Sequence, residues 1–288
     1  MPQRALRRPF SCLLLFVVLA ATALAARAAP SAALAGLVNQ WRDAPAGCDG
    51  RAGAPLAPLQ VDTVLERVVL RPGASLPAAL ERAGYLFERA QAIVVSCAGD
   101  DERAMDVLRE RYCALLRDPA FSRLAVTRTG NEWQVLLARP LLAPDLAPWR
   151  DAGREVLARV NAARAQPRLC GSKRFGAAGP LRWNERLGNA AFGHSQDMAR
   201  NDYFDHQGRD GSALGQRVQR TGYRARSLGE NIAAGQGDEA AAVAGWVASP
   251  GHCANLMDPR FTEMGAAYAV NGASRGKIYW TQVFGTPL

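Results

Sequence analysis

The chain has 288 residues, of which 49% are hydrophobic and 21% charged, a composition typical of folded globular proteins and not of disordered chains. Its 35 Lys and Arg exceed its 26 Asp and Glu, so the net charge is +9 at pH 7. These basic residues are scattered and do not form the concentrated basic face of a nucleic-acid-binding protein, so no nucleic-acid partner is expected.

The first 28 residues have the features of a secretory leader. Three arginines between residues 4 and 8 precede an apolar run over residues 13–25, and small residues follow, with cleavage expected after Ala25 or Ala28. The run is shorter than the roughly 20 apolar residues that cross a bilayer, and no later segment reaches that length, so no transmembrane anchor is expected. We predict a signal peptide over residues 1–28 and a secreted or periplasmic protein.

The rest of the sequence contains an internal repeat, with offsets that grow from 122 to 147 along the chain. The matched pairs, in one order, include Asn39/Asn161, Arg42/Arg164, Cys48/Cys170, Tyr85/Tyr223, Cys113/Cys253 and Trp133/Trp280. An ordered series of this kind predicts a tandem duplication. The expected organisation is an N-terminal half over residues 29–142, a Pro-rich linker over 143–149 and a C-terminal half over 150–288.

The repeat also predicts the cysteine pairing. Five cysteines follow the leader, which in an oxidising compartment suggests two disulfides and one thiol. Because the aligned cysteines fall one pair in each half, each half should close its own bridge, as Cys48–Cys113 and Cys170–Cys253. Cys97 has no counterpart and is expected to be a buried free thiol.

In the C-terminal half, hydrophobic periodicity predicts a helix over residues 155–166 and a second over about 184–201, capped by Asn184. Two shorter helices are expected, one from Ser212 to Gly222 and one from Asp238 to Pro250. Residues 264–270 and 277–284 predict two strands joined by a loop. Several helices with a small antiparallel sheet give an α+β architecture.

All three histidines lie in the C-terminal half, as His194, His206 and His252, and Glu230 stands between the last two. Two imidazoles and a carboxylate can form the first shell of a zinc ion. They can equally form a hydrogen-bonded cluster that responds to pH, because histidine titrates near neutrality. His194 lies on an apolar helical stripe, where a structural role competes with a role as ligand.

Three segments around these residues resemble the bacterial branch of the CAP superfamily (cysteine-rich secretory proteins, antigen 5 and pathogenesis-related 1; the SCP domain). They are Tyr203–His206 (YFDH), Gly229–Ala233 (GENIA) and Ser249–Met257 (SPGHCANLM). The resemblance covers residues 155–288. It implies a three-layer α-β-α sandwich with a central cleft, lined by two histidines and acidic residues that hold a divalent metal in some members.

Carried over by residue, the resemblance implies that His206, His252 and Glu230 line the cleft. The family's second acidic residue falls here on Ser249, so Glu263 is a weaker candidate for the missing carboxylate. His194 is likewise a weaker candidate ligand.

Two functions remain open. The first is a non-enzymatic binding module whose cleft holds a metal, a lipid, a cell-envelope component or a protein segment. The second is a metal-assisted hydrolase, with Glu230 as general base and the histidines holding a zinc-bound water. The binding module is favoured, because the sequence has no His-Glu-x-x-His segment and no evident serine or cysteine nucleophile. No catalytic residue is assigned.

The N-terminal half lacks every candidate ligand. The stretch that would match His194 and His206 is shorter by 16 residues. The remaining positions align as Gln91/Glu230, Tyr112/His252 and Arg123/Glu263. The sequence therefore predicts a degenerate CAP-like domain that keeps the fold without the site.

Overall fold

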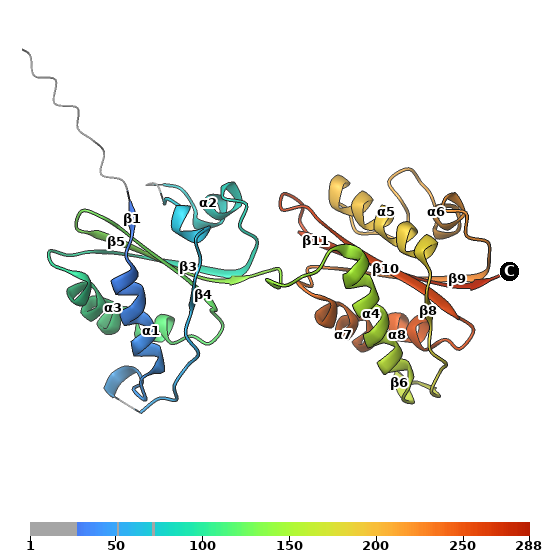
Figure 1. Ribbon diagram of the computed structural model, residues 1–288, viewed down its shortest axis with the longest axis horizontal. Helices are drawn as coiled ribbons and strands as arrows, with labels where there is room; N and C mark the ends of the chain where they lie inside the picture. The colour runs from blue at the N-terminus through green and yellow to red at the C-terminus, as the bar shows by residue number, and fades with distance from the viewer. Residues whose placement is uncertain (1–27, 51, 71–72) are drawn as a thin grey trace, which may run out of the picture.

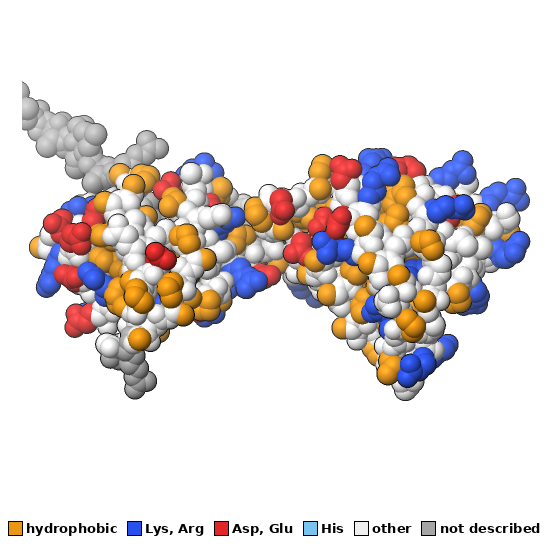
Figure 2. All heavy atoms as spheres, turned by 60° about the horizontal axis from the view of Figure 1, so that its bottom comes forward, with side chains coloured by type: hydrophobic (Ala, Val, Ile, Leu, Met, Phe, Trp, Pro, Cys, Tyr) orange, Lys and Arg blue, Asp and Glu red, His pale blue; other side chains and the backbone are white. Residues whose placement is uncertain are grey.

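The computed structural model describes residues 28–50, 52–70 and 73–288. Residues 1–27, which hold almost all of the expected signal peptide, lie outside the described residues. The two halves of the chain form two lobes that meet at a narrow waist (Figures 1 and 2). Within the described part of the chain, no helix has the length and hydropathy that a membrane span requires.

The N-terminal half is built on one sheet with the strand order β1-β4-β5-β3, and β2 also pairs with β4. Its elements are β1 (Ala29–Pro30), α1 (Ala32–Asp43), η1 (Cys48–Gly50), β2 (Gln60–Val61), η2 (Leu65–Arg67), α2 (Leu76–Arg82), β3 (Phe87–Ser96), α3 (Asp101–Leu116), β4 (Arg123–Thr129) and β5 (Glu132–Pro140). Helices α1 and α3 pack on one face around the buried Trp133. Helix α2 packs on the other face through Leu80.

The C-terminal half is built on a four-stranded sheet with the order β8-β10-β11-β9. Its elements are α4 (Trp149–Arg164), β6 (Arg168–Cys170), β7 (Lys173–Phe175), β8 (Arg182–Trp183), α5 (Glu185–Asn201), α6 (Leu214–Arg220), β9 (Ala225–Ala234), α7 (Glu239–Ala248), α8 (Pro250–Met257), β10 (Glu263–Val270) and β11 (Ile278–Pro287). The short β8 runs parallel to β10, whereas the other neighbours are antiparallel, so the sheet is mixed.

Helices cover both faces of this sheet because successive residues of a strand point to opposite sides. In β11, Trp280 faces α4, α7 and α8, whereas Val283 faces α5 and α6. Helix α5 lies very close to β10, since a Cβ atom on Gly265 would fall 2.0 Å from the backbone nitrogen of Gly188. The mixed α and β architecture expected from the sequence is present, with helices on both sides of the sheet (Figure 1).

Several local predictions need correction. Helix α4 begins at Trp149, inside the expected linker and six residues before the predicted start. The N-cap of α6 is Ala213 and not Ser212. Strand β9 and helix α8 were not expected. Pro250 occupies the first turn of α8, where its missing N–H costs nothing, so the proline starts a new helix as well as ending α7.

Each half contains one disulfide. The sulfur atoms of Cys48 and Cys113 are 1.98 Å apart, and those of Cys170 and Cys253 are 1.94 Å apart. The second bridge ties the β6–β7 hairpin to α8, the helix that carries His252. Among the described cysteines, Cys97 has no disulfide partner, and it is half-buried instead of fully buried.

Candidate functional site

The candidate site forms where the segment after α5 returns to strand β9. The Asn184 side chain caps α5 by accepting from the backbone N–H groups of Arg186 and Leu187. The helix ends at Asn201, and the φ of 48° at its C-cap, Asp202, reverses the chain. The returning chain is held by His194, whose Nε2 donates to the carbonyl oxygen of Asp205 at 2.9 Å. The next residue, His206, is thereby placed beside β9.

Glu230, on β9, is the centre of the site. Its side chain is only 4% exposed, and both carboxylate oxygens are engaged. His206 Nδ1 donates to Oε1 at 2.9 Å, and Arg217 Nη2 donates to Oε2 at 2.7 Å. His194 Nε2 lies 4.0 Å from Oε1. The structure therefore brings two of the three histidines to one carboxylate, together with an arginine.

These contacts shift the pKa values of the site in opposite directions. Burial alone would raise the pKa of Glu230, but the hydrogen bond from His206 and the charge of Arg217 outweigh it, so the carboxyl stays ionised. The hydrogen bond to Glu230 raises the pKa of His206 in spite of partial burial. Burial lowers the pKa of His194, which favours its neutral form.

His252 reaches the site from the opposite side, on helix α8. Two amides dock this helix on β9: Asn231 Nδ2 donates to the carbonyl of His252 at 3.1 Å, and Asn255 Nδ2 donates to that of Glu230 at 3.2 Å. Burial, followed by the positive charge of His206, lowers the pKa of His252. The two asparagines therefore fix the position of His252 relative to β9.

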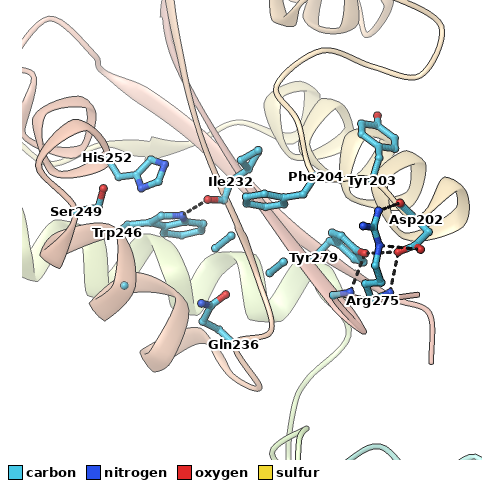
Figure 3. A pocket seen from close by; sticks show the side chains of 14 residues that line it. Asp202, Tyr203, Phe204, Ile232, Gln236, Trp246, Ser249, His252, Arg275 and Tyr279 are labelled. Atoms are coloured by element: carbon cyan, nitrogen blue, oxygen red, sulfur yellow. Dashed lines mark hydrogen bonds and ion pairs between the residues drawn. The ribbon is translucent and has the colours of Figure 1, made fainter. Parts of the chain in front are cut away.

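A cavity of about 720 Å³ opens beside His252 (Figure 3). Ser249 and His252 lie at one end, Asp202 and Arg275 lie at the other, and aromatic rings lie between them. Its lining comprises Asp202, Tyr203, Phe204, Ile232, Ala233, Ala234, Gln236, Gly245, Trp246, Ser249, His252, Arg275, Gly276 and Tyr279. Phe204 is 54% exposed, an unusual position for a large apolar side chain next to polar neighbours.

Glu263 does not join this group. It starts β10, two strands away from β9 in the sheet order. Its carboxylate accepts from Asn184 Nδ2 at 3.0 Å and from the Tyr223 hydroxyl at 2.9 Å, and Arg182 lies 3.5 Å away. These partners give Glu263 a role in fixing the start of α5, apart from the cleft.

The donor set fits a metal only in part. Among the described residues, no three His, Cys, Asp or Glu side chains are arranged to hold an ion. Glu230 is a poor first-shell ligand, because a guanidinium and an imidazole N–H occupy its oxygens. His206 Nε2 has no hydrogen-bond partner in the described part of the chain, and a carboxylate on the other ring nitrogen is the usual outer partner of a metal-binding histidine. His206 and His252 would hold a zinc ion here, and the ion would supply Lewis-acid chemistry.

Sequence reasoning missed Arg217, the residue that neutralises Glu230. The available signal was its helix position, since it falls between Leu214 and Val218 on the face expected to point inward. A charged residue on an inward face needs a buried partner. It also missed Arg275, in the β10–β11 loop, and Tyr279, at the start of β11, because only the folded hairpin brings them to the cleft.

Comparisons with known proteins match part of the chain to a family. Residues 157–284 match CAP, the Cysteine-rich secretory protein family. The chain is 36% identical over 105 residues to the uncharacterized protein YkwD of Bacillus subtilis, and 36% identical over 104 residues to the uncharacterized membrane protein YlbC of the same organism. Each match covers 36% of this chain, and the matches cover 39% of YkwD and 28% of YlbC.

Among solved structures, an extracellular protein containing an SCP domain from Bacillus anthracis is similar, with 21% identity and a TM-score of 0.41. That similarity covers 75% of this chain and 74% of that one. A cysteine-rich secretory protein from Staphylococcus aureus has 13% identity and a TM-score of 0.37 over 56% of this chain and 55% of its own. Residues 157–284 of the chain form a CAP domain.

Proposed function

We propose that the protein is a secreted, non-enzymatic binding module whose CAP-domain cleft holds a segment of a partner protein or a cell-envelope component. The observation that carries this proposal is the cavity beside His252, with exposed Phe204 in a lining that also offers hydrogen-bonding groups. Two disulfides and the leader-like N-terminal sequence support an oxidising, extracytoplasmic location.

The lining suits a ligand with both apolar and polar groups. Trp246, Tyr279 and Phe204 offer aromatic surface, and the paired Arg275 and Asp202 offer polar groups. Gln236 Oε1 is buried and has no hydrogen-bond partner among the described residues. A ligand N–H or O–H would satisfy that oxygen, because buried polar atoms are rarely left unpaired.

The test is co-sedimentation of the mature protein with isolated bacterial envelopes. Phe204→Ala should lower the bound fraction at least about fivefold, which is the effect of losing one aromatic contact at an interface. Leu169→Ala is the matched control, since Leu169 is 58% exposed but lies on the β6–β7 hairpin and does not line the cavity. Equal binding by both variants and the wild type would contradict the proposal.

A divalent metal is the second proposal for the same site, and metal-assisted hydrolysis is its catalytic form. The supporting observation is the His206–Glu230 hydrogen bond, which leaves Nε2 of the imidazole free. Metal analysis of the purified mature protein should find zinc that His252→Ala removes. A metal content unchanged by that substitution would argue against His252 as a ligand. A Glu230→Gln variant tests separately whether Glu230 acts as a general base.

We also propose that the N-terminal half is a shortened, degenerate copy of the CAP domain. The order β2-β4-β5-β3 matches β8-β10-β11-β9, with the same parallel and antiparallel neighbours. Asn39 exchanges two hydrogen bonds with the Leu59 backbone at 3.0 and 2.8 Å, and Asn161 does the same with Leu181 at 3.0 and 2.8 Å. Among the described residues between β2 and α2, the short η2 is the one helical element, and none of them forms a counterpart of α5.

The sheet register corrects one aligned pair. Glu230 pairs with Val283, three residues after Trp280, and Ala92 pairs with Leu136, three residues after Trp133. Ala92, and not Gln91, therefore stands where Glu230 would be. Separate expression of residues 29–142 and 150–288 should give two folded domains, of which only the second binds zinc or envelopes. A first fragment that binds as well as the second would overturn this assignment.

A further inference from the structure

Two loops of the CAP domain contribute residues to the lining of the cleft and also contact the N-terminal half or the linker. The β9–α7 loop, residues 235–238, contributes Gln236 to the cavity. The β10–β11 loop, residues 271–277, contributes Arg275 and Gly276. In Figure 3, Arg275 lies at the end of the pocket opposite His252, and Gln236 lies between these two ends.

The β10–β11 loop is fastened on its cleft side to the end of α5. The backbone N–H of Arg275 donates to Asp202 Oδ1 at 2.7 Å, and Arg275 Nε donates to Oδ2 at 3.2 Å. The N–H of Gly276 donates to the Tyr279 hydroxyl at 3.0 Å. Any displacement of this loop therefore moves side chains that line the cavity.

The outer side of the same loop meets the N-terminal half. Lys277, whose φ is 60°, places its Nζ 3.2 Å from Glu81 Oε1 at the end of α2 and 2.8 Å from the carbonyl of Gly272. Gly272 lies against Leu86, since a Cβ atom there would be 3.0 Å from Leu86 Cδ2. Leu86 precedes β3 and packs against the core of the C-terminal half.

The linker holds the β9–α7 loop in the same way. The N–H of Ala143 donates to the carbonyl of Gly237 at 3.1 Å, and a Cβ atom on Gly237 would lie 1.7 Å from the carbonyl oxygen of Leu141. Leu141 is 8% exposed and belongs to the core that contains Trp246 and Trp280. Trp280 Nε1 in turn donates to the carbonyl of Gln236 at 2.7 Å.

We infer that the N-terminal half and the linker are the positioning partner of the cleft, acting through Glu81, Leu86 and Leu141 on these two loops. This gives the half without a site a role in shaping the site of the other half. That this positioning affects ligand binding rests on the proposed function. The positioning of the two loops does not, because it can be measured without any ligand.

The first test uses hydrogen exchange of the full chain, followed in the peptide covering residues 271–277. Glu81→Lys should raise the exchange rate of this loop about two- to fivefold, the range expected for one exposed ion pair. Combining it with Lys277→Glu should restore the wild-type rate. Glu88→Lys is the matched control, because its ion pair with Arg139, at 2.9 Å, lies wholly within the N-terminal half. Equal exchange in Glu81→Lys and Glu88→Lys, or no rescue by the double variant, would overturn the inference.

The second test uses the indole N–H signals in ¹⁵N–¹H NMR spectra. Gly237→Ala should shift the Trp280 signal, because the added Cβ forces the linker and the loop apart and strains the Trp280–Gln236 hydrogen bond. The Trp183 indole, which donates to Glu185 Oε2 at 3.0 Å and touches neither loop, should stay in place. An unshifted Trp280 signal in a folded variant would contradict the inference, whatever the result of the envelope-binding experiment.

Discussion

Arg217 and Glu230 form an ion pair inside the CAP domain, with Nη2 and Oε2 2.7 Å apart and side chains only 9% and 4% exposed. The same guanidinium donates through Nη1 to the carbonyls of His206 and Ser212, at 2.9 and 2.8 Å. Arg217 therefore fixes both the carboxylate and the segment that carries His206. Its removal takes the donor and the countercharge from Oε2 of a buried carboxylate, which keeps only His206 on Oε1.

Arg217→Ala should destabilise the protein by about 3–5 kcal/mol, as the loss of one partner of a buried ion pair does. The measurement is urea denaturation followed by circular dichroism. Arg220→Ala is the matched control: its pair with Asp210 has side chains 60% and 54% exposed, and the loss should stay below about 1 kcal/mol. Similar losses in both variants would show that the buried pair does not hold the site.

The three histidines should titrate differently. NMR of the imidazole groups should give His206 a pKa above 6.5 and His194 and His252 values below it. Glu230→Gln should lower the pKa of His206 by removing its hydrogen-bond acceptor. It should also raise the pKa of His252, which would then face less positive charge. Glu155→Gln, on the exposed side of α4, should change neither value.

The same shifts give a pH dependence of stability with two signs. Because the folded pKa of His206 is raised, its contribution is complete below pH 6.5 and is lost as the pH rises through that folded value. Because the folded pKa of His252 is lowered, its contribution is present above pH 6.5 and is lost as the pH falls through its folded value. The difference in stability between the wild type and His206→Gln should shrink as the pH rises from 5 to 8, whereas the difference between the wild type and His252→Gln should grow. Denaturation of both variants across this range measures the two slopes.

Replacing Cys170 and Cys253 by serine should cost about 2–5 kcal/mol, because the bridge closes a loop between residues 83 positions apart. Thermal unfolding of the double variant measures this loss. Non-reducing peptide mapping of the wild type should recover Cys48–Cys113 and Cys170–Cys253. A link between the two halves would contradict both pairs.

Two glycines of the CAP domain should respond oppositely to alanine. At Gly265, a Cβ atom would lie 2.0 Å from the Gly188 nitrogen, so Gly265→Ala should destabilise the fold by about 1–3 kcal/mol. At Gly245, inside α7, nothing lies within 4 Å, so Gly245→Ala should stabilise it by about 0.5–1 kcal/mol. Urea denaturation of the two variants tests both directions.

The local order of the sequence was enough to predict much of this protein. Apolar spacing together with the Asn184 cap predicted α5, and the paired positions of the two halves predicted the cysteine pairs that the structure contains. These signals lie in residues that are neighbours in the chain, or in an order of residues that the two halves repeat. The motifs around His206, Glu230 and His252 likewise predicted the CAP domain that residues 157–284 form.

Tertiary structure decided what surrounds each of these residues. Arg217 reaches Glu230 only because α6 packs beside β9, and Glu263 is kept from the cleft because β10 and β9 are separated by β11. Gln236 and Arg275 are 39 residues apart in the chain, yet two different loops bring both to the lining of one cavity. The sequence alone determined which groups carry charge, titrate or form helices and strands. Their distances, and hence their pKa values and partners, follow from packing between distant segments, which no local pattern encodes.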